Sequence, residues 1–197
     1  FLKTVQMPVP IADLSIQELP GRGKMGKSEA KNSDWDALLL PIADGHAIGL
    51  ISEAGCPAVA DPGSDLVKRA HQRNIPVMPH IGPSSLLLAL MGSGLGGQRF
   101  AFHGYLPQDD QGRKQALSRL EEESRRLDVT QIVIETPYRN RVFFESLVQG
   151  LKPNTQLCVA ADLTMPSQLI QTRTIEQWKK SGAPTLDKRP AVFLFKH

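Results

Sequence analysis

Hydrophobic positions along the chain switch between helical spacing and short continuous runs, and this alternation predicts an α/β fold. In the first half, Asp34 can cap a helix over 34–42, and the apolar run 47–52 follows as a short buried strand. A helix over 65–73 and a short strand over 75–79 repeat the same order. Because helices alternate with short apolar strands, the pattern predicts a parallel sheet.

The second half of the chain repeats this organisation. Gly82-Pro83-Ser84-Ser85 opens an apolar helix that ends in the glycines of 92–97. The later pattern predicts helices over 112–126 and 141–151, strands over 131–135 and 157–163, a short helix at Trp178 and a closing strand over 191–195. That last run is apolar throughout, which is typical of a strand inside a sheet. With a boundary near 103–107, the prediction is two α/β domains, 1–103 and 104–197.

Composition adds few constraints to this picture. The 197 residues are 41% hydrophobic and 22% charged, which is ordinary for a globular protein and excludes a disordered or fibrous one. A net charge of +3 permits a polyanionic partner, but 23 basic against 20 acidic residues is not the balance of a dedicated nucleic-acid clamp. The basic segment 21–33 is predicted to be a surface loop that could face a partner.

Cysteine usage and the chain ends set further expectations. Cys56 and Cys158 are far apart and lack a nearby His or Cys at ligand spacing, which argues against a zinc site or a disulfide scaffold. No apolar stretch reaches the roughly 18 residues of a membrane span, so we expect a cytosolic protein without a membrane partner. The chain begins with Phe1 and no signal pattern, and we expect a truncated amino terminus.

Two strand-to-helix loops are candidate ligand sites. The first, 49–63, carries several glycines and prolines after a predicted strand, and such loops bind ligands in α/β proteins. The second is Ile81-Gly82-Pro83-Ser84-Ser85, in which both serines could donate to a ligand. Each has a plainer explanation, as a turn-setting connection and as a helix cap respectively. Neither loop has the P-loop or the dinucleotide-binding pattern.

Polar residues also follow two predicted strands of the second half. Glu135-Thr136-Pro137-Tyr138-Arg139-Asn140 places a carboxylate, a hydroxyl, a phenol and a guanidinium within six positions, and 160–164 repeats a polar strand end. A shared site and an ordinary surface turn both explain them. The charges of 113–126 favour a salt-bridged helix face over phosphate contacts, and His103 is predicted to be structural.

Several motifs in a fixed order resemble those of one enzyme family. They are Ser52-Glu53-Ala54-Gly55-Cys56-Pro57 with Asp61-Pro62-Gly63, Ile81-Gly82-Pro83-Ser84-Ser85, Phe102-His103-Gly104-Tyr105-Leu106-Pro107, Glu135-Thr136 and Asp162-Leu163-Thr164. This order resembles the small-subunit ribosomal RNA cytidine 2′-O-methyltransferases, of the tetrapyrrole methylase-like superfamily. The family typically has Asp and Thr where this chain has Glu53 and Cys56, so the chain resembles a divergent branch.

The resemblance implies two α/β domains with S-adenosylmethionine in the cleft between them, a homodimer, and ribosomal RNA or the small ribosomal subunit as partner. It also implies that the family's first strand and its loop precede Phe1. The positions implied to surround the cofactor are Glu53, Ala54, Gly55, Pro57, Ser84, Ser85, Glu135, Thr136, Ala161, Pro190 and Ala191.

The chemistry implied by the resemblance is an in-line methyl transfer that requires no metal. A ribose hydroxyl loses its proton as it attacks, and Glu135 is the candidate general base. Three other hypotheses stay open: a tetrapyrrole methyltransferase of the same fold, an interaction module that has lost catalysis, and an unrelated nucleotide-binding α/β protein.

Overall fold

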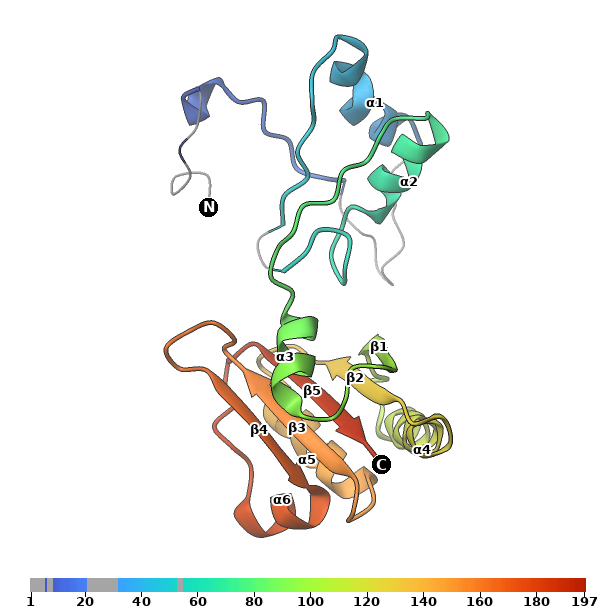
Figure 1. The fold of residues 1–197 in the computed structure, drawn as a ribbon, viewed down its shortest axis with the longest axis vertical. Helices are drawn as coiled ribbons and strands as arrows, with labels where there is room; N and C mark the ends of the chain where they lie inside the picture. Colours follow the sequence, from blue (N-terminus) through green and yellow to red (C-terminus); the bar gives the residue numbers. More distant parts are fainter. Residues whose placement is uncertain (1–5, 7–8, 21–31, 53–54) are drawn as a thin grey trace. The chain divides into compact units, whose positions relative to one another are not determined.

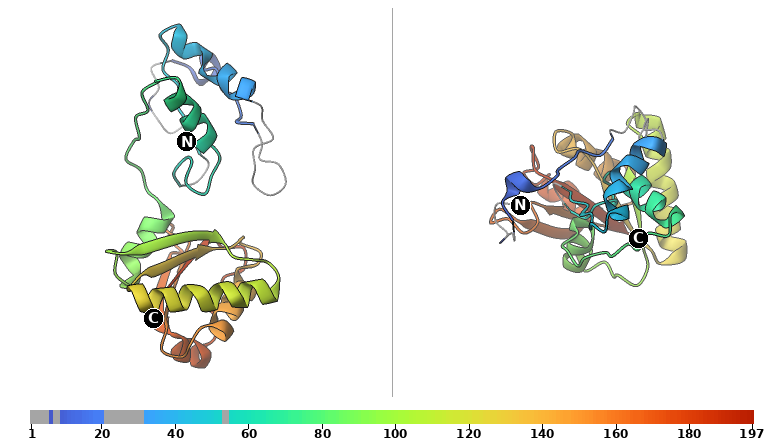
Figure 2. Two further views of the ribbon diagram at one scale, coloured as in Figure 1. Left: turned by 90° about the vertical axis from the view of Figure 1, so that its right-hand side faces the viewer. Right: turned by 90° about the horizontal axis from the view of Figure 1, so that it is seen from above.

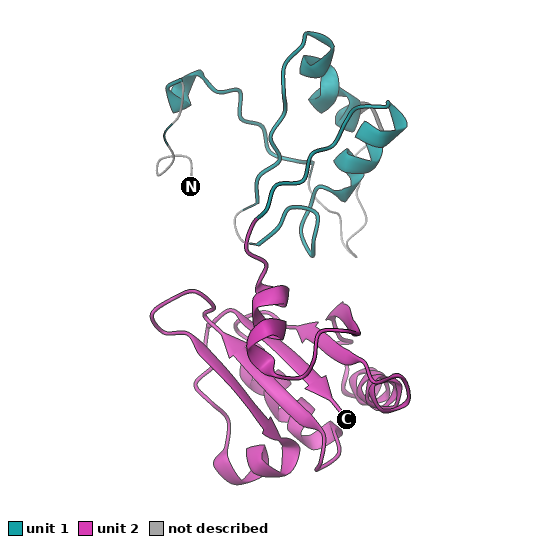
Figure 3. Cartoon of the chain, in the orientation of Figure 1, with its two compact units in different colours: residues 1–81 teal, residues 82–197 magenta. Residues whose placement is uncertain are grey.

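The structure is a computed structural model that describes residues 6, 9–20, 32–52 and 55–197. It divides into two compact units, residues 1–81 and 82–197 (Figure 3). Each unit is described by itself. The basic segment predicted as a loop lies mostly outside the described residues, because the description resumes at Asn32, where α1 begins.

Unit 1 is held together by two helices. Helix α1 (Asn32–Ala43) and helix α2 (Ser64–Gln72) confirm the two predicted helices, and a short 3-10 helix, η2, covers Ile11–Asp13. Apolar residues of α1 and α2 form a small core: Trp35, Leu39, Leu66 and Ala70. Beside it, the carboxylate of Asp36 accepts hydrogen bonds from Arg69, one of them from Nη2 at 2.5 Å, and pairs with Arg73.

The two strands predicted in unit 1 do not form in the described part of the chain. Segments 47–52 and 75–79 lack β-ladder pairing there, and the parallel sheet predicted from them is absent from these residues. Most of their apolar side chains are exposed, among them Ile51 (55%) and Met78 (78%), whereas Leu50 and Ile75 pack against the small core of unit 1. A strand exists only with a hydrogen-bonded neighbour, so apolar runs of the right length do not make a sheet by themselves.

Unit 2 is a three-layer α/β structure around one mixed sheet (Figure 1, Figure 2). The strand order is β1-β2-β5-β3-β4; β1 and β2 pair parallel, and the other neighbours pair antiparallel. The strands are β1 Phe100–Tyr105, β2 Thr130–Ile134, β3 Gln156–Ala161, β4 Leu169–Thr174 and β5 Ala191–Lys196. The helices are α3 Ser85–Ser93, α4 Asp110–Leu127, α5 Asn140–Gly150 and α6 Ile175–Ser181. These elements confirm the helices and strands predicted for this half and add β1 and β4.

Local sequence explains where the helices begin. Asp109 caps α4 by accepting a hydrogen bond from the amide of Gly112 (2.7 Å). Thr174 and Gln177 form a reciprocal capping box at the start of α6. On α4, Arg125 pairs with Glu122 (2.6 Å), as predicted for a salt-bridged helix face.

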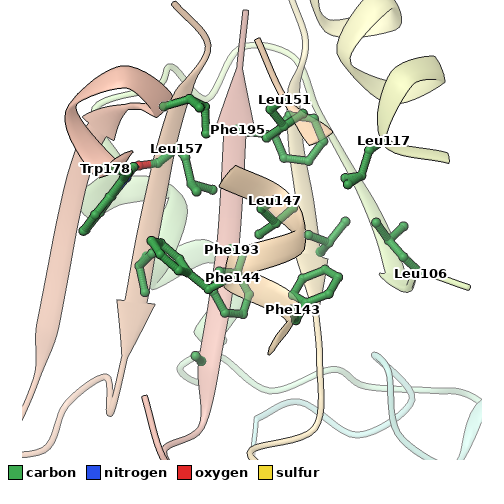
Figure 4. Packing of buried hydrophobic residues seen from close by; sticks show 14 of the residues in the cluster. Leu106, Leu117, Phe143, Phe144, Leu147, Leu151, Leu157, Trp178, Phe193 and Phe195 are labelled. Atoms are coloured by element: carbon green, nitrogen blue, oxygen red, sulfur yellow. The ribbon is translucent and has the colours of Figure 1, made fainter. Parts of the chain in front are cut away.

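The sheet of unit 2 separates two apolar cores. One face packs against α4, α5 and α6, where Trp178 contacts Phe144 edge to face and donates from Nε1 to the carbonyl of Leu157 (2.8 Å) (Figure 4). The other face packs against α3. There Gly92 lies so close to Ile170 that an added Cβ would fall 2.7 Å from its side chain. The closing strand β5 is the middle strand, which confirms the interior position predicted from its apolar run.

The compact units do not coincide with the two predicted domains. Helix α3 belongs to unit 2 because it packs on the sheet, and Thr172 Oγ1 donates to the carbonyl of Ser93 (2.7 Å). A boundary after 103 would also cut β1, which pairs with β2. The division into domains 1–103 and 104–197 stays a prediction. Within the described ranges, every helix is too short or too polar to span a bilayer.

The core facing α5 generates a stability prediction. Leu147 is fully buried there, whereas Leu87 on α3 is half exposed. We expect Leu147→Ala to lower the free energy of unfolding by about 2–5 kcal/mol, because it leaves a cavity. Leu87→Ala is the control and should change it by less than about 1 kcal/mol. Urea unfolding followed by Trp178 fluorescence in a Trp35→Phe background reports on unit 2; equal effects of the two substitutions would contradict the packing described.

Candidate functional site

Three chain segments meet at one edge of the sheet of unit 2. Because β5 runs antiparallel to both β2 and β3, its beginning lies beside their ends. Ile134 pairs with Val192, and Ala161 pairs with Ala191. The segments that follow β2 and β3 and precede β5 therefore converge there (Figure 1). We call this the site edge; it brings together the predicted positions Glu135, Thr136, Ala161, Pro190 and Ala191.

The start of α3 lies at the same edge. Downstream of α3, the carbonyls of Leu95 and Gly96 accept from Thr130 Oγ1 at the beginning of β2, so the helix runs from the site edge toward the opposite edge. Ser84 is the residue before the helix and adopts an extended conformation without a side-chain cap. Ser85 is exposed. The first amides of α3 thus lack the cap that we predicted Ser84 could supply, and they can donate to a ligand.

Glu135 is a buried carboxylate at the end of β2. Its side chain is 5% exposed; Oε1 accepts from the amide of Thr136 (2.7 Å), and Oε2 lies 3.8 Å from Nε of Arg139. Thr136 and Tyr138 in the following turn are exposed. A carboxylate held at a strand end beside exposed hydroxyls can accept a proton from a bound alcohol.

Asn140 begins α5 next to this turn and is fully buried. Its Nδ2 donates to the carbonyl of Arg189 (2.6 Å), which ties the start of α5 to the segment before β5. Its Oδ1 has no hydrogen-bond partner among the described residues. A buried acceptor is normally satisfied by protein, water or ligand, so Asn140 belongs to the candidate site.

Arg189 and Asp162 join the loops on either side of this edge. Nε of Arg189 donates to Oδ2 of Asp162 (2.7 Å), Nη1 donates to the carbonyl of Thr185 (2.8 Å), and Nη2 donates to the carbonyl of Ser167. Oδ2 of Asp162 also accepts from Ser167 Oγ (2.8 Å). The hydrogen bond from Ser167 and the Arg189 guanidinium together hold the pKa of Asp162 below its ordinary value.

The loop predicted to bind the cofactor from the first half lies in unit 1. Gly55 has a left-handed backbone (φ 77°), and the following turn is closed by the amide of Ala58 donating to the carbonyl of Pro62 (3.3 Å). Pro57 lies in this turn and is half-buried. Glu53 and Ala54 lie outside the described residues. Because the two units are described separately, the place of Gly55 and Pro57 beside a cofactor stays a prediction.

Two residues of the site were not predicted from the sequence. The sequence pattern gives Asn140 no role beyond the end of the polar cluster after β2, and it gives none to Arg189. One feature of the sequence could have indicated Arg189. It is a charged residue directly before Pro190 and the buried closing strand, where its charge needs a hydrogen-bonding partner. His103, predicted to be structural, hydrogen-bonds Gln131 (Nε2 to Oε1, 2.6 Å), which confirms that interpretation.

Two solved methyltransferase structures superpose on this chain. The chain superposes on the methyltransferase CobJ with a TM-score of 0.57 and 17% identity, covering 89% of this chain and 77% of that one. It superposes on the cobalt precorrin-4 methyltransferase CbiF, a cobalamin biosynthetic enzyme, with a TM-score of 0.55 and 12% identity, covering 85% and 72%. The fold is therefore that of the tetrapyrrole methylases, which confirms the predicted α/β fold, and the arrangement of two domains with a cofactor cleft between them stays a prediction.

Sequence relatives define the family more narrowly. Proteins named ribosomal RNA small subunit methyltransferase I match from Synechocystis sp. (38% identity over 127 residues, 64% of this chain and 44% of the relative) and Escherichia coli O157:H7 (35% over 129 residues, 66% and 44%). The protein of that name from Buchnera aphidicola subsp. Acyrthosiphon pisum matches at 30% over 161 residues, 80% and 55%. No family model matches the chain.

Over the matched segment the chain is similar in sequence to the proteins named ribosomal RNA small subunit methyltransferase I, as the resemblance of its motifs predicted. It spans about half the length of the curated relatives that it matches, with 44% to 55% of each covered in these three. The fold, and the sequence similarity to these relatives over the matched segment, are thus established.

The lowered pKa of Asp162 generates a prediction about acid stability. A carboxyl whose pKa is lowered by folding stabilises the folded state above its unfolded value of 3.8, and this contribution is lost as the pH falls through the lower folded value. We expect Asp162→Asn to lower the thermal midpoint at neutral pH and to leave a smaller acid-induced decrease than in the wild type. Thermal melts from about pH 2 to pH 7 measure both. Parallel acid profiles of the two proteins would contradict the ion pair.

Proposed function

We propose that the chain is part of an S-adenosylmethionine-dependent methyltransferase that methylates a ribose 2′-oxygen of ribosomal RNA in the small ribosomal subunit. The observation that carries this proposal is the sequence similarity to proteins named ribosomal RNA small subunit methyltransferase I, at 30–38% identity. The site edge supports it by bringing predicted cofactor positions from three chain segments together.

The residues of the site edge fit a cofactor that is held mainly through backbone groups. Pro190 is exposed and Ala191 is small, so a ligand can approach the backbone at the start of β5 closely, while Ala161 is fully buried beside them. The uncapped amides at the start of α3, beside Ser84 and Ser85, can donate to a carboxylate or a hydroxyl. When bound, S-adenosylmethionine supplies an electrophilic methyl group on a sulfonium.

Glu135 is the proposed general base. An attacking ribose hydroxyl must lose its proton, and a carboxylate within hydrogen-bond reach can take it. Oε1 is held by the amide of Thr136 and Oε2 faces Arg139, so the carboxylate is kept in one orientation. The exposed Thr136 and Tyr138 flank it and can contact the substrate. Correct positioning of donor and acceptor can lower the barrier by about 7–11 kcal/mol.

We also propose that the protein acts in the cytoplasm, where its ribosomal substrate is found, and that it forms a homodimer. The homodimer is proposed from the family resemblance, and multi-angle light scattering of the purified protein tests it. The bacterial relatives and the proposed substrate support the location.

The first experiment measures cofactor binding and methyl transfer. We expect S-adenosylmethionine and its demethylated product to bind in calorimetric titrations, and small ribosomal subunits to accept labelled methyl groups on ribose. Methyl transfer to a tetrapyrrole, with none to RNA, would show that the substrate is a tetrapyrrole and not ribosomal RNA. Binding of ATP or NAD in place of the cofactor would favour a nucleotide-binding protein, and binding without transfer to any acceptor would favour an interaction module.

Glu135 offers a sharper test with a matched control. We expect Glu135→Gln to lower kcat by about 10²–10⁴-fold, because the amide cannot take the proton, with cofactor affinity changed little. Glu145→Gln is the control: Glu145 also faces an arginine four residues away, with its Oε1 3.4 Å from Arg141 Nε, but is exposed on α5. It should retain wild-type kcat. Wild-type turnover by Glu135→Gln would exclude Glu135 as the base.

A further inference from the structure

Pro190 and Ala191 are predicted cofactor positions, and a backbone hydrogen bond just beyond the paired ends of β3 and β5 holds them in place. Ala161 and Ala191 are paired residues of β3 and β5, and the amide of Asp162 donates to the carbonyl of Pro190 (3.0 Å). This hydrogen bond extends the ladder by one step at the site edge. Asp162 then leaves the strand with a left-handed backbone (φ 49°). The geometry of Pro190 and Ala191 therefore depends on where Asp162 is held.

The side chain of Asp162 is held in place by the segment before β5, which is the same segment that the backbone amide of Asp162 contacts. It pairs with Arg189, the residue before Pro190, and both side chains are largely buried, at 15% and 20% exposure. The three nitrogens of the Arg189 guanidinium donate to three different acceptors, on Asp162, Ser167 and Thr185. The carbonyl of Arg189 is held in turn by Asn140. Arg189 thus links the loop after β3, the segment before β5 and the start of α5.

We infer that Asp162 and Arg189 are positioning residues for the cofactor: their ion pair holds the backbone of Pro190 and Ala191 where the proposed site binds S-adenosylmethionine. This inference rests on the proposed function. Backbone groups recognise a ligand only when they are kept in place, and a displacement of about 1 Å can cost about 10²-fold. The ion pair supplies that constraint from side chains that need not touch the cofactor.

The chain offers a control with a similar backbone conformation at the opposite edge of the sheet, where the carboxylate is 80% exposed. Asp128 also has a left-handed backbone, φ 54° against 49° for Asp162, and its Oδ1 pairs with Lys196 Nζ (2.8 Å). Asn tolerates the left-handed region, so Asp162→Asn and Asp128→Asn each remove one ion pair without adding backbone strain. A loss confined to Asp162→Asn then shows that the buried pair at the site edge, and not the removal of any aspartate charge, supports binding.

The test titrates the demethylated cofactor product into the wild type, Asp162→Asn, Arg189→Lys, the double variant and Asp128→Asn. All titrations are made at a temperature where circular dichroism shows each protein folded. We expect about tenfold weaker binding for each single variant at the pair, because lysine keeps the charge but cannot reach three acceptors. The double variant should bind no more weakly than either single one, and Asp128→Asn should stay within about twofold of the wild type.

A second readout separates positioning from general stability. In the methyl-transfer assay, KM for the cofactor should rise in Asp162→Asn while kcat at saturating cofactor stays within about threefold, because Asp162 does not touch the reacting atoms. Wild-type affinity in Asp162→Asn or Arg189→Lys overturns the inference, as does an equal loss in Asp128→Asn. If Asp162→Asn weakens cofactor binding and Arg189→Lys does not, the inference is replaced by a direct contact between Asp162 and the cofactor. Absence of binding by the wild type overturns the proposed function itself.

Discussion

The structure of unit 2 depends on the burial of β5. Every side chain from Phe193 to Phe195 is fully inaccessible, and the strand is hydrogen-bonded on both sides, by β2 and β3. Successive side chains of a strand point to opposite faces, so Phe193 and Phe195 enter the core beneath α5 while Val192 and Leu194 enter the core beneath α3. One strand therefore joins both apolar layers, and the other elements are arranged around it.

The position of the site follows from the direction of that strand. Because β5 runs antiparallel to β2 and β3, its first residues must lie beside the last residues of both. The polar segments that follow β2 and β3 come from distant parts of the sequence, yet they meet for this reason alone. The packing of β5 in the core thus places Glu135 and Ala161 at the same edge. The sheet already brings the neighbouring loops together there, and the hydrogen bonds of Arg189 then join them. A fold that is shared at 12–17% identity can keep such an edge while its side chains change.

The sequence predicted those features that depend on local pattern. Helical spacing predicted α1 to α5, and the unbroken apolar run predicted the interior position of β5. Strand β4 was missed because each of its residues is half-buried, which leaves no clear apolar alternation. The runs 47–52 and 75–79 had the right composition, but pairing depends on a neighbour that composition does not specify. Arg189 was missed for a similar reason, since its partner Asp162 lies 27 residues earlier and only the folded sheet brings them together.

The contacts at the site edge also explain how a divergent chain can keep one kind of site. Glu135 is oriented by neighbours in its own turn, the amide of Thr136 and the guanidinium of Arg139. Pro190 and Ala191, in contrast, are oriented by contacts between segments far apart in the sequence. Where recognition is made by backbone groups, exchange of a side chain that points away from the ligand costs little, whereas loss of a contact that fixes the backbone costs more.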